Sequence, residues 1–394
     1  MYSLYDSLCM PEADALHSVM TKLKLDQRCN KIDLGVGIYK DATGQSSVMR
    51  AVKEAEHHLV EHEHSKMYLG LEGVAAFIEN MSQLLCPKGL DDRIAKIQTV
   101  GGTGGIRLAI EMAFKTNPDL TVYVGTSTWP NHIGICQALA VNHVTYDYIN
   151  KDKQSINYES MFETIHAARP GDIIVLHGPC HNPTGIDLSN EEYLNIITLA
   201  SNKGVIPLID AAYYGLGNAL ENDLRLLNDA LTICPEAFLI MSCSKAFSLY
   251  RERVGILFSA TKNTATKHIV QASLEKLARN NYSMPPSHGA QCVATVLSNS
   301  SLKKQWTDEL DDMRNRVLNI RESLYRQANG NPVMQHLPHQ KGIFSLLELT
   351  KTNIDKLAKQ YAIYLPNSGR INIAGFKQCD EPVFIDAINN LENG

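Results

Sequence analysis

The sequence predicts an α/β protein with a large domain, built on a mostly parallel sheet sandwiched by helices, and a smaller α+β domain. Short apolar segments with the character of buried strands alternate with helical patterns, at residues 121–125, 172–178, 205–213, 237–244 and 254–260. Continuous apolar runs suit a sheet covered on both faces, and the alternation of strand and helix implies parallel connections. After about Ser300 the pattern changes, which indicates the second domain.

The predicted helices have recognisable ends. Residues 189–204 begin with a serine cap followed by acidic residues, and they end at Gly204. A long charged helix over residues 302–328 opens the C-terminal part. We therefore predict a large domain at residues 45–300, and a small domain that combines residues 301–394 with an N-terminal arm, residues 1–44.

Composition narrows the class of protein. The chain has 394 residues, of which 44% are hydrophobic and 20% charged, and its net charge of -5 gives no basic footprint for nucleic acid. The start lacks a basic segment followed by an apolar run, and no stretch is long and apolar enough to span a membrane. The nine cysteines have no regular spacing and are interpreted as reduced thiols. We expect a cytoplasmic protein without a nucleic-acid or membrane partner.

Lys245 stands in an unusual setting. It follows a predicted buried strand, among small residues in "SCSKAFSLYRERVG". Desolvation and the nearby charge of Arg253 would lower the pKa of its amine, which favours Schiff-base chemistry. The alternative is a surface lysine, the commonest fate of this residue type.

Three other segments carry groups that could bind a phosphate, a ring nitrogen or a ring oxygen. The glycine-rich turn "GGTGGIRLAIEMAF" opens a helix and offers backbone N–H groups to a phosphate, which Ser242 and Arg253 could also bind. Asp210 ends an apolar run, so its carboxylate needs a partner, and a protonated ring nitrogen would serve. Asn182 in "HNPTG" could donate to a ring oxygen. Each segment has a structural alternative: a plain turn or a structural salt bridge.

The order of these segments is more specific than any one of them. The glycine-rich turn, "STWPNH", "HNPTG", "DAAY" and "SKAFSLYRERVG" follow one another, between "DLGVGIYKDATG" and "GRINIAG" near the two ends. In this order the chain resembles the aspartate and aromatic aminotransferases, pyridoxal-phosphate enzymes of fold type I, over almost its whole length. The resemblance implies a seven-stranded type of sheet, pyridoxal 5'-phosphate as cofactor, no metal ion, and a homodimer with shared active sites.

The resemblance also implies roles for single residues. The catalytic ones are Lys245, which forms the Schiff base, Asp210, which pairs with the ring nitrogen, and Tyr213, which hydrogen-bonds the phenolic oxygen. Two histidines, His132 and His177, are expected to support the Asp210 carboxylate. The remaining cofactor contacts are Asn182 at the phenolic oxygen, Trp129 stacked on the ring, Gly102, Thr103, Ser242 and Arg253 at the phosphate, and Tyr68 from the partner subunit.

Substrate binding is expected at two arginines. Arg370 in "SGRINIAG" matches the arginine that takes the α-carboxylate, with the N–H of Gly37 nearby. Arg279 in "LARNNYSMPPSHG" matches the arginine that reaches from the partner subunit to a distal carboxylate. Two arginines for two carboxylates suit a dicarboxylate substrate. The other implied substrate contacts are Trp129 and Asn182.

The side-chain pocket departs from the strict aspartate pattern. Met67 and Met284 stand where strict aspartate enzymes tend to carry asparagine, and methionine, which is apolar and adaptable, favours an aromatic ring. Lys40 and Thr103 are of the aspartate type. We therefore predict amino transfer between aspartate, tyrosine or phenylalanine and 2-oxoglutarate. The alternatives are a narrow aspartate aminotransferase, a decarboxylase or lyase on the same scaffold, and a catalytically dead binding protein.

Overall fold

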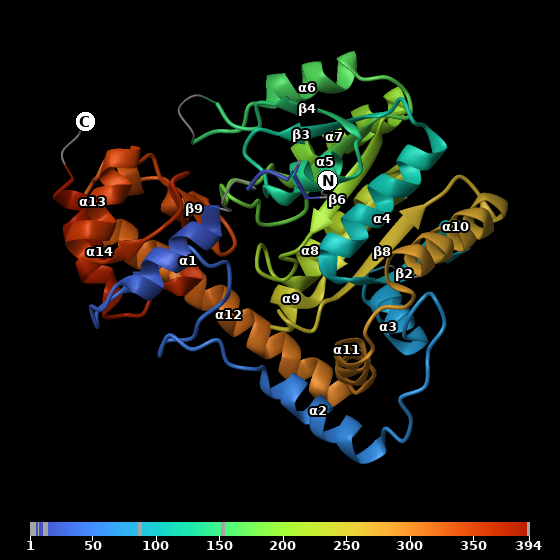
Figure 1. The fold of residues 1–394 in the computed structure, drawn as a ribbon, viewed down its shortest axis with the longest axis horizontal. Helices are drawn as coiled ribbons and strands as arrows, with labels where there is room; N and C mark the ends of the chain where they lie inside the picture. The colour runs from blue at the N-terminus through green and yellow to red at the C-terminus, as the bar shows by residue number, and fades with distance from the viewer. Residues whose placement is uncertain (1–4, 7, 11–14, 86–88, 151–153, 392–394) are drawn as a thin grey trace.

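A twisted sheet forms the centre of the larger part of the molecule (Figure 1). The computed structural model describes the chain except residues 1–4, 7, 11–14, 86–88, 151–153 and 392–394. Within the described residues the sheet has seven strands, and all are parallel except β8, which runs antiparallel to both of its neighbours. Their order across the sheet is β2 (Ile94–Val100), β8 (Val254–Ala260), β7 (Ala237–Ser242), β6 (Ile206–Ala211), β5 (Ile173–His177), β3 (Thr121–Gly125) and β4 (Asn142–Tyr146).

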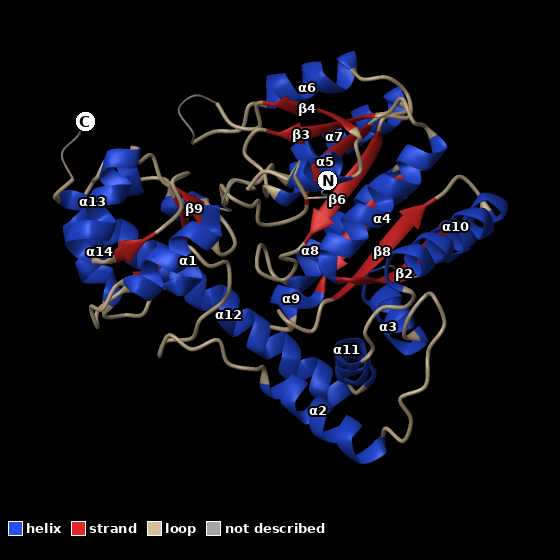
Figure 2. Ribbon diagram, viewed as in Figure 1, coloured by secondary structure: helices blue, strands red, loops and turns tan. Residues whose placement is uncertain are grey.

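Helices cover both faces of this sheet (Figure 2). One apolar cluster joins the first face to α4 (Gly101–Thr116), α5 (Asn131–Ala138) and α10 (Thr264–Tyr282). A larger cluster joins the other face to α3 (Ala75–Leu85), α6 (Tyr158–Ala167), α7 (Asn190–Lys203) and α8 (Leu220–Ile233). Because both faces are buried, the central strands are apolar along most of their length, and polar residues stand near their carboxyl ends.

The N-terminal segment packs on the C-terminal part of the chain. There β1 (Ile32–Asp33) pairs with β10 (Ile363–Tyr364), and β9 (Phe344–Leu346) pairs with β11 (Arg370–Asn372). The helices of this part are α1 (Ala15–Leu25), α13 (Lys351–Tyr361) and α14 (Asp380–Asn389). Segments from near both ends of the chain therefore form one small α+β unit.

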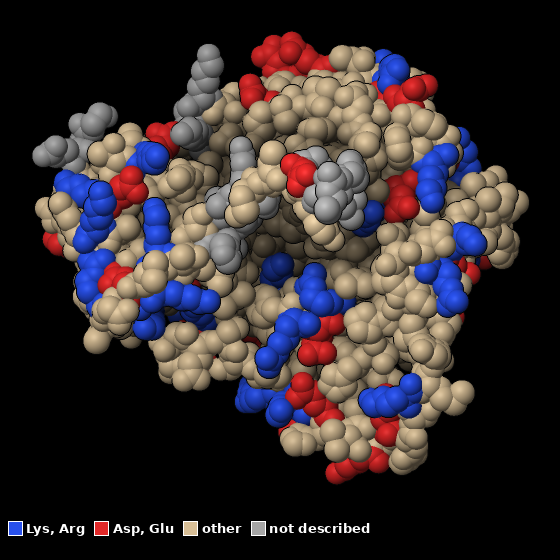
Figure 3. Space-filling model, viewed as in Figure 1, with Lys and Arg blue, Asp and Glu red and all other residues tan. Residues whose placement is uncertain are grey.

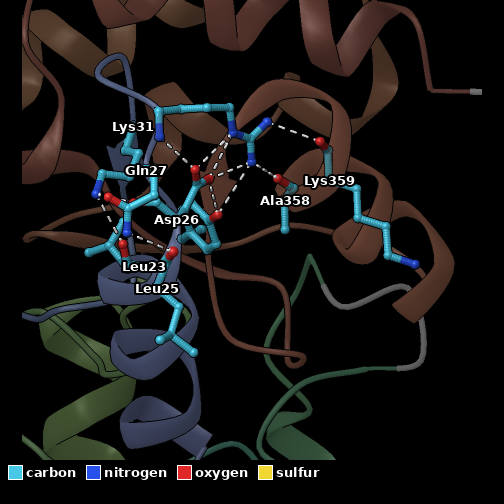
Figure 4. A network of polar contacts seen from close by, with 9 residues as sticks. Leu23, Leu25, Asp26, Gln27, Lys31, Ala358 and Lys359 are labelled. Carbon is cyan, nitrogen blue, oxygen red and sulfur yellow. Dashed lines mark hydrogen bonds and ion pairs between the residues drawn. The ribbon is translucent and has the colours of Figure 1, made fainter.

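A polar network fastens α1 to α13 (Figure 4). Asp26, just after α1, accepts hydrogen bonds from the Arg28 guanidinium and from the Tyr364 hydroxyl. The same guanidinium donates to the carbonyls of Ala358 and Lys359 in the last turn of α13, at 2.7 and 3.0 Å. Arg28 thereby satisfies carbonyls that the helix end leaves without partners.

The helix α12 (Ser300–Gln327) runs from the large part of the molecule to the small one (Figure 1). It packs on α2 (Arg50–His62) and α11 (His288–Ser298), and further along on α14. Trp306 near its start is fully buried, stacks on Phe247 with ring centroids 4.4 Å apart, and donates from Nε1 to the Ala246 carbonyl at 2.7 Å. It therefore holds the turn that follows Lys245.

The predicted fold class is confirmed, including the seven-stranded sheet that the resemblance implied. The analysis of apolar runs identified five of these strands and missed β2 and β4, which lie at the two edges of the sheet. In β4 most residues are at least partly exposed, and β2 carries Lys96 and Gln98, so neither has a continuous apolar run. The boundaries at residues 44 and 301 stay a prediction, and residues 1–4, 7 and 11–14 of the predicted arm lie outside the described residues.

Trp306 gives a test of this architecture. We expect Trp306→Ala to lower the free energy of unfolding by about 3–5 kcal/mol, because it leaves a cavity against Phe247 and an unpaired carbonyl. Tyr325→Ala, at a partly exposed site on the same helix, should change it by less than about 1 kcal/mol. Urea denaturation followed by circular dichroism measures both, and equal losses would contradict the proposed importance of Trp306.

Candidate active site

A polar pocket opens at the carboxyl ends of β5, β6 and β7, where the sheet and the connecting turns meet. Its lining includes most of the residues that the sequence indicated for a cofactor: Gly102, Thr103, Trp129, Asn182, Asp210, Tyr213, Ser242, Lys245 and Arg253. These residues lie near strand ends and in the turns and helix starts next to them. Parallel strands bring the turns together because their carboxyl ends share one edge.

Asp210 is buried in β6 and bonded to a histidine. Its Oδ2 lies 3.1 Å from Nε2 of His132, whose ring is completely buried in α5. Burial alone would raise the pKa of Asp210, but the hydrogen bond from His132 and the charge of Lys245 hold that pKa below its usual value. The carboxylate therefore stays ionised, ready for a cationic partner.

A chain of hydrogen bonds, in which each group donates to the next, leads to Asp210. The backbone N–H of Asn182 donates to Nδ1 of His177, so the neutral ring of His177 carries its proton on Nε2. That N–H can donate to the Thr128 hydroxyl at 3.0 Å, the hydroxyl to Nδ1 of His132 at 2.8 Å, and Nε2–H of His132 to Asp210. Burial lowers the pKa of His177 to about 3, which keeps this ring neutral.

Lys245 lies in the short helix α9 (Cys243–Ala246), directly after β7. Its Nζ is 5.2 Å from the centre of the Tyr213 ring. Burial lowers the pKa of the amine to about 8, and the charges of Arg253 and Arg370 act in the same direction, whereas Asp210 opposes them. A buried lysine with this pKa has a substantial neutral fraction near neutral pH, as a nucleophilic or basic amine requires.

An anion cradle forms at the start of α4. Among the described residues no side chain caps this 16-residue helix. The N–H of Gly101 donates to the Arg253 carbonyl at 2.9 Å, so the N–H groups of the next residues, Gly102 and Thr103, are the ones that can bind an anion at the pocket. The guanidinium of Arg253 lies so close to Gly101 that a Cβ there would collide with it. Arg253 itself has a φ of 57°, a left-handed conformation that is uncommon and strained for a non-glycine residue. Ser242 and Ser244 complete the cradle.

Arg370 lies at the other side of the pocket, on β11. Its Nη1 donates to the amide oxygen of Asn182 at 3.2 Å, and its Nη2 donates to the Gly35 carbonyl at 2.8 Å. Because the amide oxygen of Asn182 accepts from Arg370, its side-chain N–H groups remain as donors at the pocket that Asn182 lines. The guanidinium of Arg370 lies 4.3 Å from the centre of the Phe344 ring, which also closes against Gly37.

The structure does not bring every predicted residue into this pocket. Tyr68 and Met67 are 92% and 82% exposed, and they line a separate surface groove with Met284. Arg279 is exposed near the end of α10 and bonds to Ser283. Lys40 is paired with Asp33 at 3.3 Å. None of these residues lines the Lys245 pocket within one chain.

The sequence interpretation missed Thr128, Ser244, Cys180 and Phe344. Thr128 joins the two histidines, and Ser244 and Cys180 line the pocket. Thr128 and Ser244 lie inside the quoted segments, next to Trp129 and Lys245, and Cys180 stands directly before "HNPTG", so neighbourhood in the sequence could have indicated these three. Phe344 has no such signal, because only the folding of β9 against β11 brings it to Arg370.

Comparison with known proteins agrees with this site. The family described as aminotransferase class I and II matches residues 29–388. The chain belongs to this family. The predicted resemblance is confirmed, and the protein is an aminotransferase with the fold type I architecture.

Relatives of both expected kinds resemble the chain over nearly its full length. An aromatic-amino-acid aminotransferase of Paracoccus denitrificans is 39% identical and covers 96% of this chain and 97% of its own. An aspartate aminotransferase of Salmonella typhi is 35% identical, with coverages of 94% and 96%. The crystal structure of an aromatic-amino-acid aminotransferase from Burkholderia pseudomallei, covalently bound to pyridoxal phosphate, has a TM-score of 0.95, 30% identity, and coverages of 98% and 99%.

The buried amine of Lys245 should give the cofactor-free aminotransferase a distinctive pH dependence. The pKa of Lys245 is about 8 when folded, against 10.5 for an ordinary lysine, so between these values the unfolded chain binds more protons. Stability contributed by this group is therefore gained as pH rises above 8. Relative to Lys245→Met, the free energy of unfolding of the wild type should rise by up to about 1.4 kcal/mol per pH unit in this range.

The measurement is urea denaturation of both cofactor-free proteins at several pH values between 7 and 10. Comparing the two cancels the effects of other titrating groups, such as the buried thiols and phenols. A difference that stays constant across this range would mean that the Lys245 amine is not desolvated.

Proposed function

We propose that the protein is a pyridoxal-phosphate-dependent aminotransferase that moves the amino group between aspartate, tyrosine or phenylalanine and 2-oxoglutarate, in ping-pong order. The observation that carries this proposal is the pocket itself. It holds a buried amine of lowered pKa, an ionised carboxylate and an anion cradle, beside an arginine suited to a carboxylate. The cofactor-bound relative supports the choice of pyridoxal phosphate.

The residues present fit this cofactor chemically. The cradle of Gly102, Thr103, Ser242 and Arg253 suits its phosphate, Asp210 suits a protonated ring nitrogen, and the donors Asn182 and Tyr213 suit its phenolic oxygen. When bound, pyridoxal phosphate supplies an electron sink for the substrate α-carbon. Trp129, at the mouth of the pocket, would cover the ring and exclude water.

The chain's own residues account for the proton transfer. We assign it to the Lys245 amine, whose pKa of about 8 leaves it able both to take a proton and to return it. Asp210 keeps its negative charge because His132 donates a hydrogen bond to it. His177 is neutral and so adds no positive charge that would offset the carboxylate in place of the cofactor. Tyr213 stays protonated, since burial raises its pKa, and so remains a hydrogen-bond donor.

Two arginines account for the substrate carboxylates in this proposal. Arg370 would take the α-carboxylate in a bidentate contact, with the backbone of Gly37 close by. Arg279 would take the distal carboxylate of aspartate or 2-oxoglutarate. Lys and Arg side chains also lie along the lower margin of the hollow in Figure 3, which favours the approach of anionic substrates.

The aromatic substrates are proposed on the basis of Met67 and Met284. These methionines and Tyr68 line one surface groove, and the backbone N–H of Leu69 lies 3.4 Å from the Met284 sulfur. A groove lined by methionine adapts to flat apolar groups. Relatives named for aspartate and for aromatic amino acids resemble the chain to a similar degree, which supports a dual substrate range.

We further propose a homodimer with shared active sites. Tyr68 is 92% exposed, and neither it nor Arg279 lines the Lys245 pocket of its own chain, so both would act on the pocket of a second copy. None of the described helices is both long and apolar enough to span a membrane. The described cysteines are free thiols, which supports the proposed location in a reducing cytoplasm.

The substrate range is tested by titrating the cofactor-loaded enzyme with aspartate, tyrosine and phenylalanine separately, without keto acid. We expect each of the three amino acids to change the visible absorbance of the bound cofactor. Arg279→Ala should reduce the efficiency with aspartate by about tenfold to a hundredfold, because a charged hydrogen bond contributes about 1.5–3 kcal/mol. With phenylalanine the change should stay within a few-fold. Conversion by aspartate alone would favour the narrow aspartate enzyme, and equal losses would make Arg279 structural.

Shared sites are tested with mixed dimers of Lys245→Ala and Arg279→Ala. Toward aspartate, Lys245→Ala alone should be nearly inactive, and Arg279→Ala alone should be reduced about tenfold to a hundredfold. In a mixed dimer one of the two sites combines an intact Lys245 with an intact Arg279 from the other chain, so about half of the wild-type activity should return. Two affinity tags used in sequence isolate the mixed dimers. Mixed dimers without activity would show that the two residues act within one chain.

A further inference from the structure

Arg321, in the second half of α12, is a buried cation with an unusual environment. The residue is 1% exposed, although arginine is almost never fully buried without a partner of opposite charge. Among the described residues it forms no ion pair with a carboxylate. Burial lowers the pKa of its guanidinium to about 9. Such a residue destabilises the fold unless its N–H groups are well satisfied.

One short segment of the chain provides the acceptors. From Nη2, Arg321 donates to the carbonyls of Lys341, Gly342 and Phe344, at 3.2, 2.8 and 2.5 Å. From Nη1 it donates to the Ser345 hydroxyl, with longer contacts to the Leu337 carbonyl and the Gln340 side chain. Residues 337–345 thus wrap around one planar guanidinium, and its rigid fork fixes the direction of their carbonyls.

This segment ends at the ring that closes the substrate side of the pocket. Phe344 lies under the Arg370 guanidinium, 4.3 Å from ring centre to Cζ, and its ring meets the Tyr213 ring edge-on at 5.8 Å. A Cβ added at Gly37 would lie only 2.6 Å from Phe344 Cζ. Phe344 therefore contacts the proposed α-carboxylate arginine, the backbone beside it and one of the proposed catalytic residues.

The segment is also fastened to the loop that carries Asn182. The backbone N–H of Lys341 donates to the Gly185 carbonyl at 2.7 Å, and a Cβ at Gly185 would collide with the Phe344 carbonyl oxygen. Asn182 in turn accepts a hydrogen bond from Arg370. A change in the direction of the Phe344 carbonyl would therefore alter the position of Arg370 in two ways. One is through the Phe344 ring, and the other is through the loop that carries Asn182.

We propose that Arg321 is a positioning residue for the α-carboxylate subsite: it orients the backbone around Phe344 and thereby holds Arg370 ready for a carboxylate. The inference rests on the proposed function, because it takes Arg370 as the carboxylate-binding residue. It assigns to Arg321 no contact with substrate or cofactor. Arg370 is proposed to bind the α-carboxylate, which all substrates share. The influence of Arg321 on substrate affinity should therefore not depend on the side chain of the amino acid.

The test measures binding of two non-reacting carboxylates to the cofactor-loaded enzyme by calorimetry. Maleate represents the dicarboxylates and 3-phenylpropionate the aromatic acids. Arg321→Lys keeps the charge and loses the planar fork, and we expect it to raise the dissociation constants of both ligands by a similar factor, about tenfold. The absorbance of the bound cofactor should not change, and the rate of the half-reaction at saturating amino acid should stay within about threefold.

Arg326→Lys is the matched control, because Arg326 lies on the same helix with a largely exposed side chain, and it should change neither constant. Ser345→Ala deletes one acceptor and leaves Arg321 in place. It should raise both constants by a smaller factor, about twofold to threefold, and keeps the test informative if the Arg321 variant fails to fold.

A double-mutant cycle with Phe344→Leu decides the route. If Arg321 acts through Phe344, Arg321→Lys should cause little further loss of affinity in the Phe344→Leu background. Additive losses, or an Arg321→Lys enzyme with a lowered melting temperature and unchanged dissociation constants, would overturn the proposal. Failure of the proposed function is distinguishable, because the wild type itself would then bind neither ligand and convert no amino acid.

Discussion

The ionised carboxylate of Asp210, buried near the carboxyl end of the central strand β6, is the constraint on which the site depends. A negative charge in this position is unfavourable unless its surroundings stabilise it. His132 does so by direct hydrogen bonding, and Thr128 and His177 hold His132 in the tautomer that donates to the carboxylate. The same charge opposes the loss of the proton from Lys245 and so limits how far the lysine pKa falls. Aspartate and lysine therefore set each other's ionisation.

The sequence was sufficient to predict those parts of the fold and of the site that depend on short segments. The central strands, the glycine-rich start of α4 and the turns with Asn182, Asp210 and Lys245 were visible because buried strands are apolar and the turns after them are polar. It was insufficient where a role arises from distant segments. The edge strands β2 and β4 lack a continuous apolar run, and Phe344 and Arg321 have no local pattern that distinguishes them from ordinary core residues.

Order along the chain also explains why the resemblance was specific while each segment alone was ambiguous. An Asn-Pro turn, a buried aspartate and a lysine after a strand all have structural explanations of their own. The sheet removes this ambiguity by bringing their carboxyl-terminal turns to one edge, where the groups lie in a single pocket. The groove of Tyr68 and Met284 remained separate because a single chain provides only part of the surface that those residues are proposed to complete.

The continuity of α12 has a consequence for how the protein can vary. Trp306 supports the turn after Lys245, and Arg321, on the same unbroken helix, supports the backbone near Arg370. Because an α-helix advances about 1.5 Å and turns about 100° with every residue, the spacing between these two side chains fixes both their separation and their relative direction. Substitutions on the exposed face of α12 leave this spacing intact. A single inserted or deleted residue between the two positions would rotate one of them away from its site, so this helix tolerates changes of composition far better than changes of length.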